Sequence, residues 1–203
     1  MVEIVKFEEK TKDEALKKCL TKLDRSIDNI YYKEREIEGK LFKSKKFEIT
    51  AIKKDDVIKF VKNYFNEVSK MMNIDIKSEV KEKDDVIVVV LVTSNNSIII
   101  GKEGRTLNSL QMVLKQAIKV NTDFNIKLNI DVANYKNKKI KNIEYEVRKI
   151  VKEVLNSKIE AKLDPMNSYE RRLVHTIVSE YKELSTESQG ENPERYVIIK
   201  YND

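Results

Sequence analysis

The sequence predicts an α+β protein built from three small domains, at residues 1–53, 54–133 and 134–203. The chain has 203 residues, of which 40% are hydrophobic, so two or three small domains can each bury a core. Segments with the two-residue period of a strand alternate with segments that have helical spacing, and no internal repeat interrupts them. The charged stretch Lys53–Asp56 marks the first boundary without a flexible linker, so the first two domains should abut closely.

The first segment has the pattern of a strand in "VEIVKF" and of an amphipathic helix at Lys12–Leu23. Two further strand-like stretches, "IYYKEREIE" and "KFEITAI", stand on either side of Gly39. We therefore expect one helix on a three-stranded sheet. Cys19 shares the apolar stripe of this helix, so we expect it to be buried rather than reactive.

The second segment has the order helix, strand, strand, short helix, glycine loop, helix, strand. Helical spacing runs from Val57 to Met72, and the strands lie in "IDIKSEV", "VIVVVLV" and "FNIKLNIDV", with a polar turn "KEKDD" between the first two. The helix after the glycine loop ends near Val120. Its buried face is expected to contain Leu107, Leu110, Val113, Leu114 and Ala117.

The third segment opens with a long helix at Asn134–Lys158, which has one apolar face and many charged residues on the other. A short strand near "IEAKL" follows, then a helix that starts at "PMNSYERR" and ends near Lys182. Asn167 and Glu170 have the spacing of a capping box, which fixes the start of that helix. Two closing strands, "LSTES" and "RYVIIKY", flank a turn at Gly190.

Composition limits the chemistry that the chain can perform. Its single cysteine and single histidine, His175, exclude an internal disulfide and the usual zinc sites, so we expect no metal and no cofactor. No nucleophile has a convincing base partner, so we expect no enzymatic activity. The longest apolar run, Val86–Val92, is too short to span a bilayer and the first ten residues lack a signal-peptide core, which favours a cytoplasmic protein.

The charge balance permits a polyanion partner without requiring one. Forty Lys and Arg residues stand against 34 Asp and Glu residues, which gives a net charge of +6 and a sequence pI near 9.1. The excess is spread thinly over the three segments, so any case for nucleic acid depends on local geometry.

The stretch "GKEG" contains two of the four glycines in the chain, Gly101 and Gly104, directly before a helix. Glycines at these positions let the backbone turn sharply and bring N–H groups close to a phosphate. The helix N-terminus, Lys102 and Arg105 add positive charge. A tight helix-to-helix turn without a ligand is the alternative. The stretch is neither a dinucleotide fingerprint nor a P-loop, because the required further glycine and the Gly-Lys-Ser/Thr sequence are absent.

A second candidate site lies in the last segment, where Arg171 and His175 are four residues apart and share one face of the helix. Together they suit an anion. In the alternative interpretation, His175 caps a core and Arg171 pairs with a carboxylate. The basic stretch "NYKNKKIK" before them either lines a path for nucleic acid or is a solvated helix face.

Two motifs resemble known nucleic-acid-binding domains. The "GKEG" loop and the elements around it resemble a type II KH domain, whose Gly-x-x-Gly loop clamps the backbone of about four nucleotides. Arg-x-x-x-His followed by "SQGENPER" and an alternating strand resembles the single-stranded nucleic-acid-binding domain named for that arginine and histidine. Behind a small front domain, this order resembles the Jag (SpoIIIJ-associated) family over essentially all 203 residues. The front domain is the least similar part: it has only Gly39 and Phe42 where the family has a glycine- and aromatic-rich turn.

The resemblance implies a set of site residues. They are Gly101, Lys102, Glu103, Gly104 and Arg105 in the loop, and Arg171, His175 and Arg195 in the last domain, with Arg172 and Lys162 as further phosphate contacts. The isoleucines before the loop and the face near Leu107 would contribute to an apolar groove for bases. Glu103 departs from the basic or neutral residues usual in such loops, and its repulsion of a phosphate is of order 1 kcal/mol.

The resemblance also implies a function and partners. It implies a bacterial protein that binds mainly single-stranded RNA, or single-stranded DNA, and acts in post-transcriptional control linked to cell-envelope growth, division and cell shape. It implies a homodimer or a heterodimer with a small KH protein, and a peripheral link to a membrane insertase or cell-division proteins. The alternative is a protein–protein scaffold that uses the KH fold for dimerisation and binds RNA weakly or incidentally.

Overall fold

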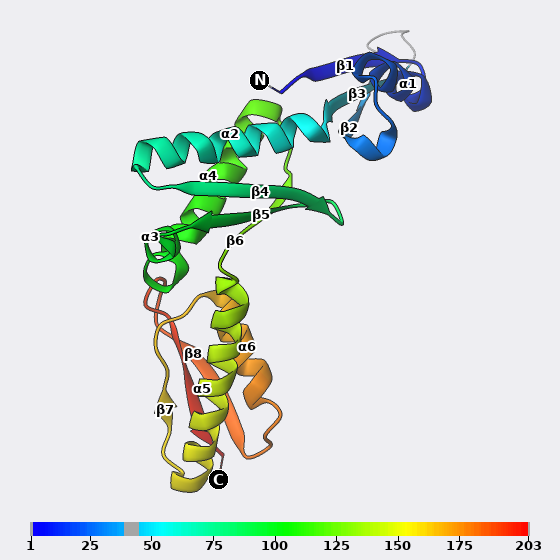
Figure 1. The fold of residues 1–203 in the computed structure, drawn as a ribbon. Helices are drawn as coiled ribbons and strands as arrows, with labels where there is room; N and C mark the ends of the chain where they lie inside the picture. The colour runs from blue at the N-terminus through cyan, green and yellow to red at the C-terminus, as the bar shows by residue number, and fades with distance from the viewer. Residues whose placement is uncertain (1, 39–44, 203) are drawn as a thin grey trace. The chain divides into compact units, whose positions relative to one another are not determined.

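The computed structural model describes residues 2–38 and 45–202, which form three three-stranded sheets with helices packed on them (Figure 1). The predicted α+β class is confirmed. The chain separates into two compact units, Met1–Ala133 and Asn134–Asp203. The further division of the first unit at residue 53 stays a prediction.

The first sheet consists of β1 (Ile4–Glu9), β2 (Ile30–Ile37) and β3 (Lys46–Lys53), in the antiparallel order β1-β3-β2, with α1 (Lys12–Leu23) on one face. One helix on a three-stranded sheet is the arrangement that the sequence predicts. The core cluster under α1 contains Val5, Ala15, Cys19, Leu23, Ile30, Ile49 and Ala51, so the expected burial of the cysteine is confirmed. Gly39 and Phe42 lie outside the described residues.

The second sheet has the order β4-β5-β6 and is built from β4 (Ile76–Lys83), β5 (Val86–Thr93) and β6 (Lys127–Val132). β4 and β5 are antiparallel, whereas β5 and β6 are parallel. The helices α2 (Lys54–Met72), α3 (Asn96–Ile100) and α4 (Arg105–Thr122) complete the unit, and α2 and α4 pack on the sheet and on each other. This is the predicted element order.

Three local predictions in this unit are wrong. The charged stretch is not a boundary: α2 begins at Lys54, because Asp55 and Asp56 in its first turn stabilise the positive end of the helix dipole. The hairpin turn is only Asp84–Asp85, both with positive φ, as a two-residue hairpin requires. On α4, Val113 is 55% exposed, and Ile118 takes a place in the core instead.

The first sheet is fixed to the second by polar contacts of two lysines. Lys54 Nζ lies 2.5 Å from Glu82 Oε1 and 3.3 Å from Asp85 Oδ1, and 5.2 Å from the ring centroid of Tyr31 on β2. Lys33, also on β2, pairs with Asp123 at the end of α4. Because β3 continues into α2 without an intervening loop, these contacts hold two elements that are already close.

The second unit packs α5 (Tyr135–Ser157) and α6 (Ser168–Val178) on a sheet of β7 (Ala161–Lys162), β8 (Leu184–Gln189) and β9 (Tyr196–Tyr201), in the antiparallel order β7-β9-β8. Its buried core contains Val147, Val151, Val154, Leu163, Val174, Ile177, Val178, Leu184, Val197 and Ile199. The predicted end of α6 near Lys182 is wrong: the helix ends at Val178, and the turn that follows packs Tyr181 against the core.

In the part of the chain that the structure describes, no helix is long and apolar enough to cross a bilayer. The same residues contain no group of three His, Cys, Asp or Glu side chains placed to hold a metal ion.

We predict that Lys54→Met destabilises the chain. The Lys54 and Glu82 side chains are 15% and 18% exposed, so removing the ammonium leaves a largely desolvated carboxylate without its partner. The expected loss is about 1–3 kcal/mol in the free energy of unfolding, measured by urea denaturation of the full chain. Lys59→Met, in the exposed pair with Asp56, is the matched control and should change little. An equal effect of both variants would contradict the prediction.

Candidate nucleic-acid interface

Gly101 has a backbone conformation and surroundings that only glycine tolerates. Its φ is +70°, and its N–H donates to the Ser97 carbonyl at 2.8 Å, which ends α3. A Cβ at this position would clash with the side chain of Thr106 and lie 3.0 Å from the Thr106 backbone nitrogen. The first glycine is therefore required by the close approach of the loop to α4.

The rest of the loop forms a single turn that leads into α4. Lys102–Gly104 is a 3₁₀ turn in which Glu103 and Gly104 have φ values of +55° and +81°. The Gly104 N–H donates to the Gly101 carbonyl at 3.2 Å. Gly104 is the N-cap of α4 and has no side chain to cap it, so the first amides of α4 face a glycine backbone. Such an end suits an anion.

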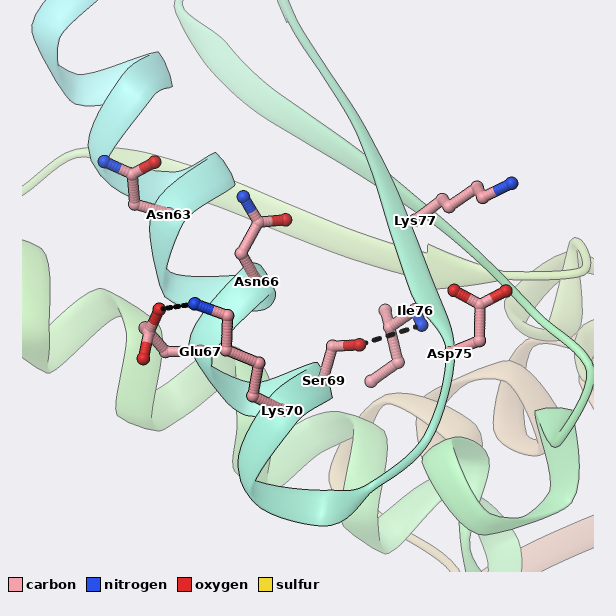
Figure 2. Close-up of a pocket in the computed structure, with 8 residues that line it drawn as sticks. All are labelled: Asn63, Asn66, Glu67, Ser69, Lys70, Asp75, Ile76 and Lys77. Atoms are coloured by element: carbon pink, nitrogen blue, oxygen red, sulfur yellow. Dashed lines mark hydrogen bonds and ion pairs between the residues drawn. The ribbon is translucent and has the colours of Figure 1, made fainter.

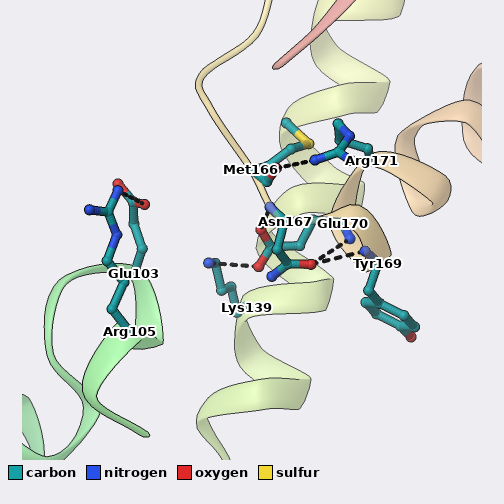
Figure 3. A network of polar contacts seen from close by, with 8 residues as sticks. All are labelled: Glu103, Arg105, Lys139, Met166, Asn167, Tyr169, Glu170 and Arg171. Atoms are coloured by element: carbon teal, nitrogen blue, oxygen red, sulfur yellow. Dashed lines mark hydrogen bonds and ion pairs between the residues drawn. The ribbon is translucent and has the colours of Figure 1, made fainter. Parts of the chain in front are cut away.

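The charges of the loop partly offset one another. Arg105 Nη2 lies 3.5 Å from Glu103 Oε2, and both side chains are about half exposed (Figure 3). Exposed pairs of this kind contribute about 0–1 kcal/mol, so a phosphate can compete with Glu103 for the guanidinium. Lys102 is exposed at the same turn.

The apolar residues beside the loop divide between surface and core. Ile98 on α3 is 50% exposed, whereas Ile99 and Leu107 are buried. Of the apolar residues predicted to line a groove, Ile98 is therefore open to a ligand, and Ile99 and Leu107 stabilise the fold instead.

In the second unit, the start of α6 is fixed by the predicted capping box, which is confirmed. Asn167 Oδ1 accepts hydrogen bonds from the backbone N–H groups of Tyr169 and Glu170 at 3.0 and 3.1 Å, and the Asn167 N–H donates to Glu170 Oε2 at 3.0 Å. Glu170 is 7% exposed and also pairs with Lys139 Nζ of α5 at 2.7 Å (Figure 3). Part of the basic stretch therefore serves the fold.

Arg171 and Arg195 both contact Met166, in the segment between β7 and α6. Arg171 Nη1 donates to the Met166 carbonyl at 2.8 Å (Figure 3), and the Met166 N–H donates to the Arg195 carbonyl at 3.0 Å. Arg195 is half-buried, and its Nε has no hydrogen-bond partner among the described residues. Arg172, the next residue on α6, is half-buried. The structure thus brings Arg171 and Arg195 near one short stretch of backbone.

His175 joins α6 to β8. Its Nδ1 lies 2.6 Å from Thr186 Oγ1 and its Nε2 lies 2.9 Å from Ser188 Oγ. Burial of the ring lowers the pKa of His175, and the nearby charge of Arg171 lowers it further. The neutral imidazole therefore donates one hydrogen bond and accepts the other.

Thr186 and Ser188 were not among the predicted site residues. Their alternation in "LSTES" places them on one face of a strand, but the sequence does not indicate which helix covers that face. Lys162 on β7 was a predicted phosphate contact, and its Nζ lies 4.1 Å from the ring centroid of Tyr196. Tyr169, in the first turn of α6, is 62% exposed.

Comparisons with known proteins cover both candidate sites. Residues 58–130 match the family model described as the KH domain of KhpA/KhpB, and residues 140–201 match the model of the domain named for its Arg-x-x-x-His motif. The chain is 31% identical to the RNA-binding protein KhpB of Clostridium symbiosum over 205 residues, which cover 98% of this chain and 91% of that protein.

It is 25% identical to the RNA-binding protein KhpB of Bacillus subtilis strain 168, with 93% of this chain and 94% of that protein covered. A putative 3′-5′ exonuclease of Acanthamoeba polyphaga mimivirus is 39% identical over 62 residues, which are 30% of this chain and 15% of that protein. The two family models cover the glycine loop and the Arg-x-x-x-His helix, in that order along the chain. The chain therefore belongs to the KhpB family, which is the Jag family that its two motifs indicate.

Proposed function

We propose that the chain is a non-enzymatic RNA-binding protein that holds single-stranded RNA at two sites. The first is the glycine loop with Gly101, Lys102, Glu103, Gly104 and Arg105, and the second is the surface formed by Arg171, Arg172, His175 and Arg195. The observation that carries the proposal is the glycine loop, in which two residues of positive φ open the N-terminus of α4 beside Lys102. Two relatives named as RNA-binding proteins support it.

At the first site, the backbone of the ligand rests on the loop. The amides of the turn and of the first α4 residues donate to phosphate oxygens, and Lys102 neutralises charge. Arg105 exchanges Glu103 for a phosphate. A base beside the loop contacts Ile98, which is an exposed apolar side chain at this point.

At the second site, Arg171 is the main phosphate contact. One of its Nη atoms is held by the Met166 carbonyl, which orients the guanidinium and leaves its other donors for the ligand. Arg195 adds charge, and the exposed ring of Tyr169 offers a surface on which a base can stack. His175 acts mainly by holding β8, because both of its ring nitrogens are already hydrogen-bonded.

Two weak sites on one chain strengthen each other when one RNA strand reaches both. Binding at the first site raises the effective concentration of the strand at the second, and overall affinity increases without any new contact. Neither site alone needs to be tight.

A scaffold function is the second candidate, and one observation favours it. On α4, Met112, Val113 and Val120 are 72%, 55% and 72% exposed, which is unusual for a charged surface and suits a protein partner. The wider proposals follow family membership: a cytoplasmic post-transcriptional regulator tied to envelope growth or division. They include pairing with itself or with a small KH protein, and a peripheral link to a membrane insertase.

We predict that both sites contribute to RNA affinity. Fluorescence anisotropy of a labelled single-stranded RNA of about 20 nucleotides, long enough to reach several contacts, should show weaker binding for Gly104→Asp, Lys102→Ala and Arg171→Ala. Each lost phosphate contact should also reduce the slope of log affinity against log salt by about 0.7. Lys149→Ala, an exposed lysine on α5, is the control.

The variant Lys102→Ala keeps both glycines, so a loss there does not arise from misfolding of the loop. Unchanged affinity and unchanged salt slope in Lys102→Ala and Arg171→Ala would remove the two-site proposal. Salt-independent binding by the unmodified protein would have the same consequence.

We predict that Glu103→Gln tightens RNA binding. The change removes a negative charge from the phosphate site and releases Arg105 from its ion pair. The gain should be about 1 kcal/mol, or roughly fivefold in Kd, at low salt, and it should shrink at high salt. Weaker binding by this variant would instead assign Glu103 a direct contact with the ligand.

We predict that His175 makes stability depend on pH. Its pKa is lowered in the folded chain, so the unfolded chain takes up the proton more readily. The stabilisation is complete above the unfolded pKa of about 6.5 and is lost as the pH falls toward the lower folded value. Urea midpoints at pH 7.5 and 5.5 should therefore differ more for the unmodified chain than for His175→Gln, and equal differences would contradict the prediction.

A further inference from the structure

Strand β4 has a free edge, because β5 is its neighbour on one side and no described strand pairs with the other. The N–H of Ile76 donates to Ser69 Oγ of α2 at 3.2 Å, so this amide points away from β5. In an antiparallel strand the outward direction recurs at every second residue. The backbone groups of Ser78 and Val80 therefore also face outward.

The first half of this edge borders an open groove (Figure 2). The groove has a volume of about 700 Å³ and lies between the last turns of α2 and the start of β4. Asn63 and Asn66 line it from the helix, and residues 75–77 line it from the strand. In the unit that contains it, no other described strand covers this edge.

The exposed side chains along β4 alternate in charge. On the face turned away from α2, the row reads Asp75, Lys77, Glu79, Lys81. The residues between them face α2: Ile76 and Val80 are buried and Ser78 is half-buried. An edge protected only by like charges would repel a second strand, whereas a row of alternating sign attracts a strand with the complementary order.

We propose that this edge binds a second copy of the chain, with the two β4 strands antiparallel about a twofold axis at Ser78. In this register Asp75 faces the partner's Lys81, and Lys77 faces the partner's Glu79. Ser78 exchanges two backbone hydrogen bonds with the partner's Ser78, and the Val80 N–H donates to the carbonyl of the partner's Ile76. The result is one continuous six-stranded sheet.

The charge row selects this register over its neighbours. A shift of two residues in one direction places Lys77 opposite the partner's Lys77, and Asp75 opposite the partner's Glu79. A shift in the other direction places Lys77 opposite the partner's Lys81, and Glu79 opposite the partner's Glu79. Like charges directly opposite each other destabilise a sheet, and side chains are closest at the positions between hydrogen-bonded pairs, where this row lies. The groove gives the partner strand room beside Asn63 and Asn66.

This interface is separate from the proposed RNA sites, since β4 and β6 are opposite edges of the sheet and the glycine loop lies between α3 and α4. It goes beyond the proposed function by naming the surface and the occupant. RNA affinity and self-association can therefore fail independently.

The test is sedimentation velocity of the full chain without RNA, over a range of protein concentrations. The unmodified chain should form a dimer whose fraction rises with concentration. Lys77→Glu and Glu79→Lys should each lower the dimer fraction, because each places like charges opposite each other twice. The double variant K77E/E79K restores opposite charges and should restore the dimer. Lys115→Glu, on the exposed surface of α4, controls for net charge.

A disulfide reports the register directly. In the proposed pairing the two Cα atoms of residue 78 are about 5.5 Å apart, within the range of a disulfide. Ser78→Cys should therefore link two chains under mild oxidation, while Lys81→Cys, far from its own copy in this register, should not. Cys19 is buried and can stay in place.

A monomer at all concentrations would overturn the proposal. So would a dimer that is indifferent to both single charge reversals, or one that is lost only when Met112 of α4 is changed to Lys, since that result places the contact on α4. RNA anisotropy of the same variants, expected within about twofold of the unmodified chain because exposed charges far from a ligand contribute little, separates these outcomes from a failure of RNA binding.

Discussion

Burial of one face of each small sheet under a helix is the constraint on which the rest of the structure depends. A three-stranded sheet with a single helical layer covers its apolar side and leaves the other side and its edges to solvent. In β5 this division follows the side-chain alternation, with Val89 and Leu91 buried and Val92 54% exposed. The surfaces left open are the loop turns, the helix starts and the strand edges, and these carry the charges from which the function is inferred.

Polar contacts then decide which of these charges remain available. Lys54, Lys139 and Glu170 are each largely occupied by partners inside the fold. Lys102 is exposed, and Arg171 is held at one nitrogen by a carbonyl that carries no formal charge to neutralise it. Net charge alone does not separate these two groups. The distinction comes from whether a carboxylate lies next to the cation, which is why a chain with only a small positive excess still offers local anion sites.

The two proposed activities place complementary demands on the second sheet. RNA uses the loop between α3 and α4, whereas self-association uses the β4 edge, so both can occur on one molecule. A dimer would present two glycine loops and two Arg171 surfaces, and a long RNA strand would then be bound by more than two weak sites. Self-association would thereby raise RNA affinity through effective concentration, without any change in the sites.

The sequence determined the features that depend on neighbouring residues in the chain. Helix α1, the capping box of α6 and the alternating strands are local patterns, and the two motifs that identified the family were found in the same way, although the roles of their residues stay predictions. Tertiary structure decided the features that join distant residues, such as the contacts of His175 with β8 and the burial of Ile118 in place of Val113. Periodicity gives a helix an apolar face about 100° wide, but it does not fix which residues at the rim are covered. Packing therefore decided which charges and apolar groups remain free to bind.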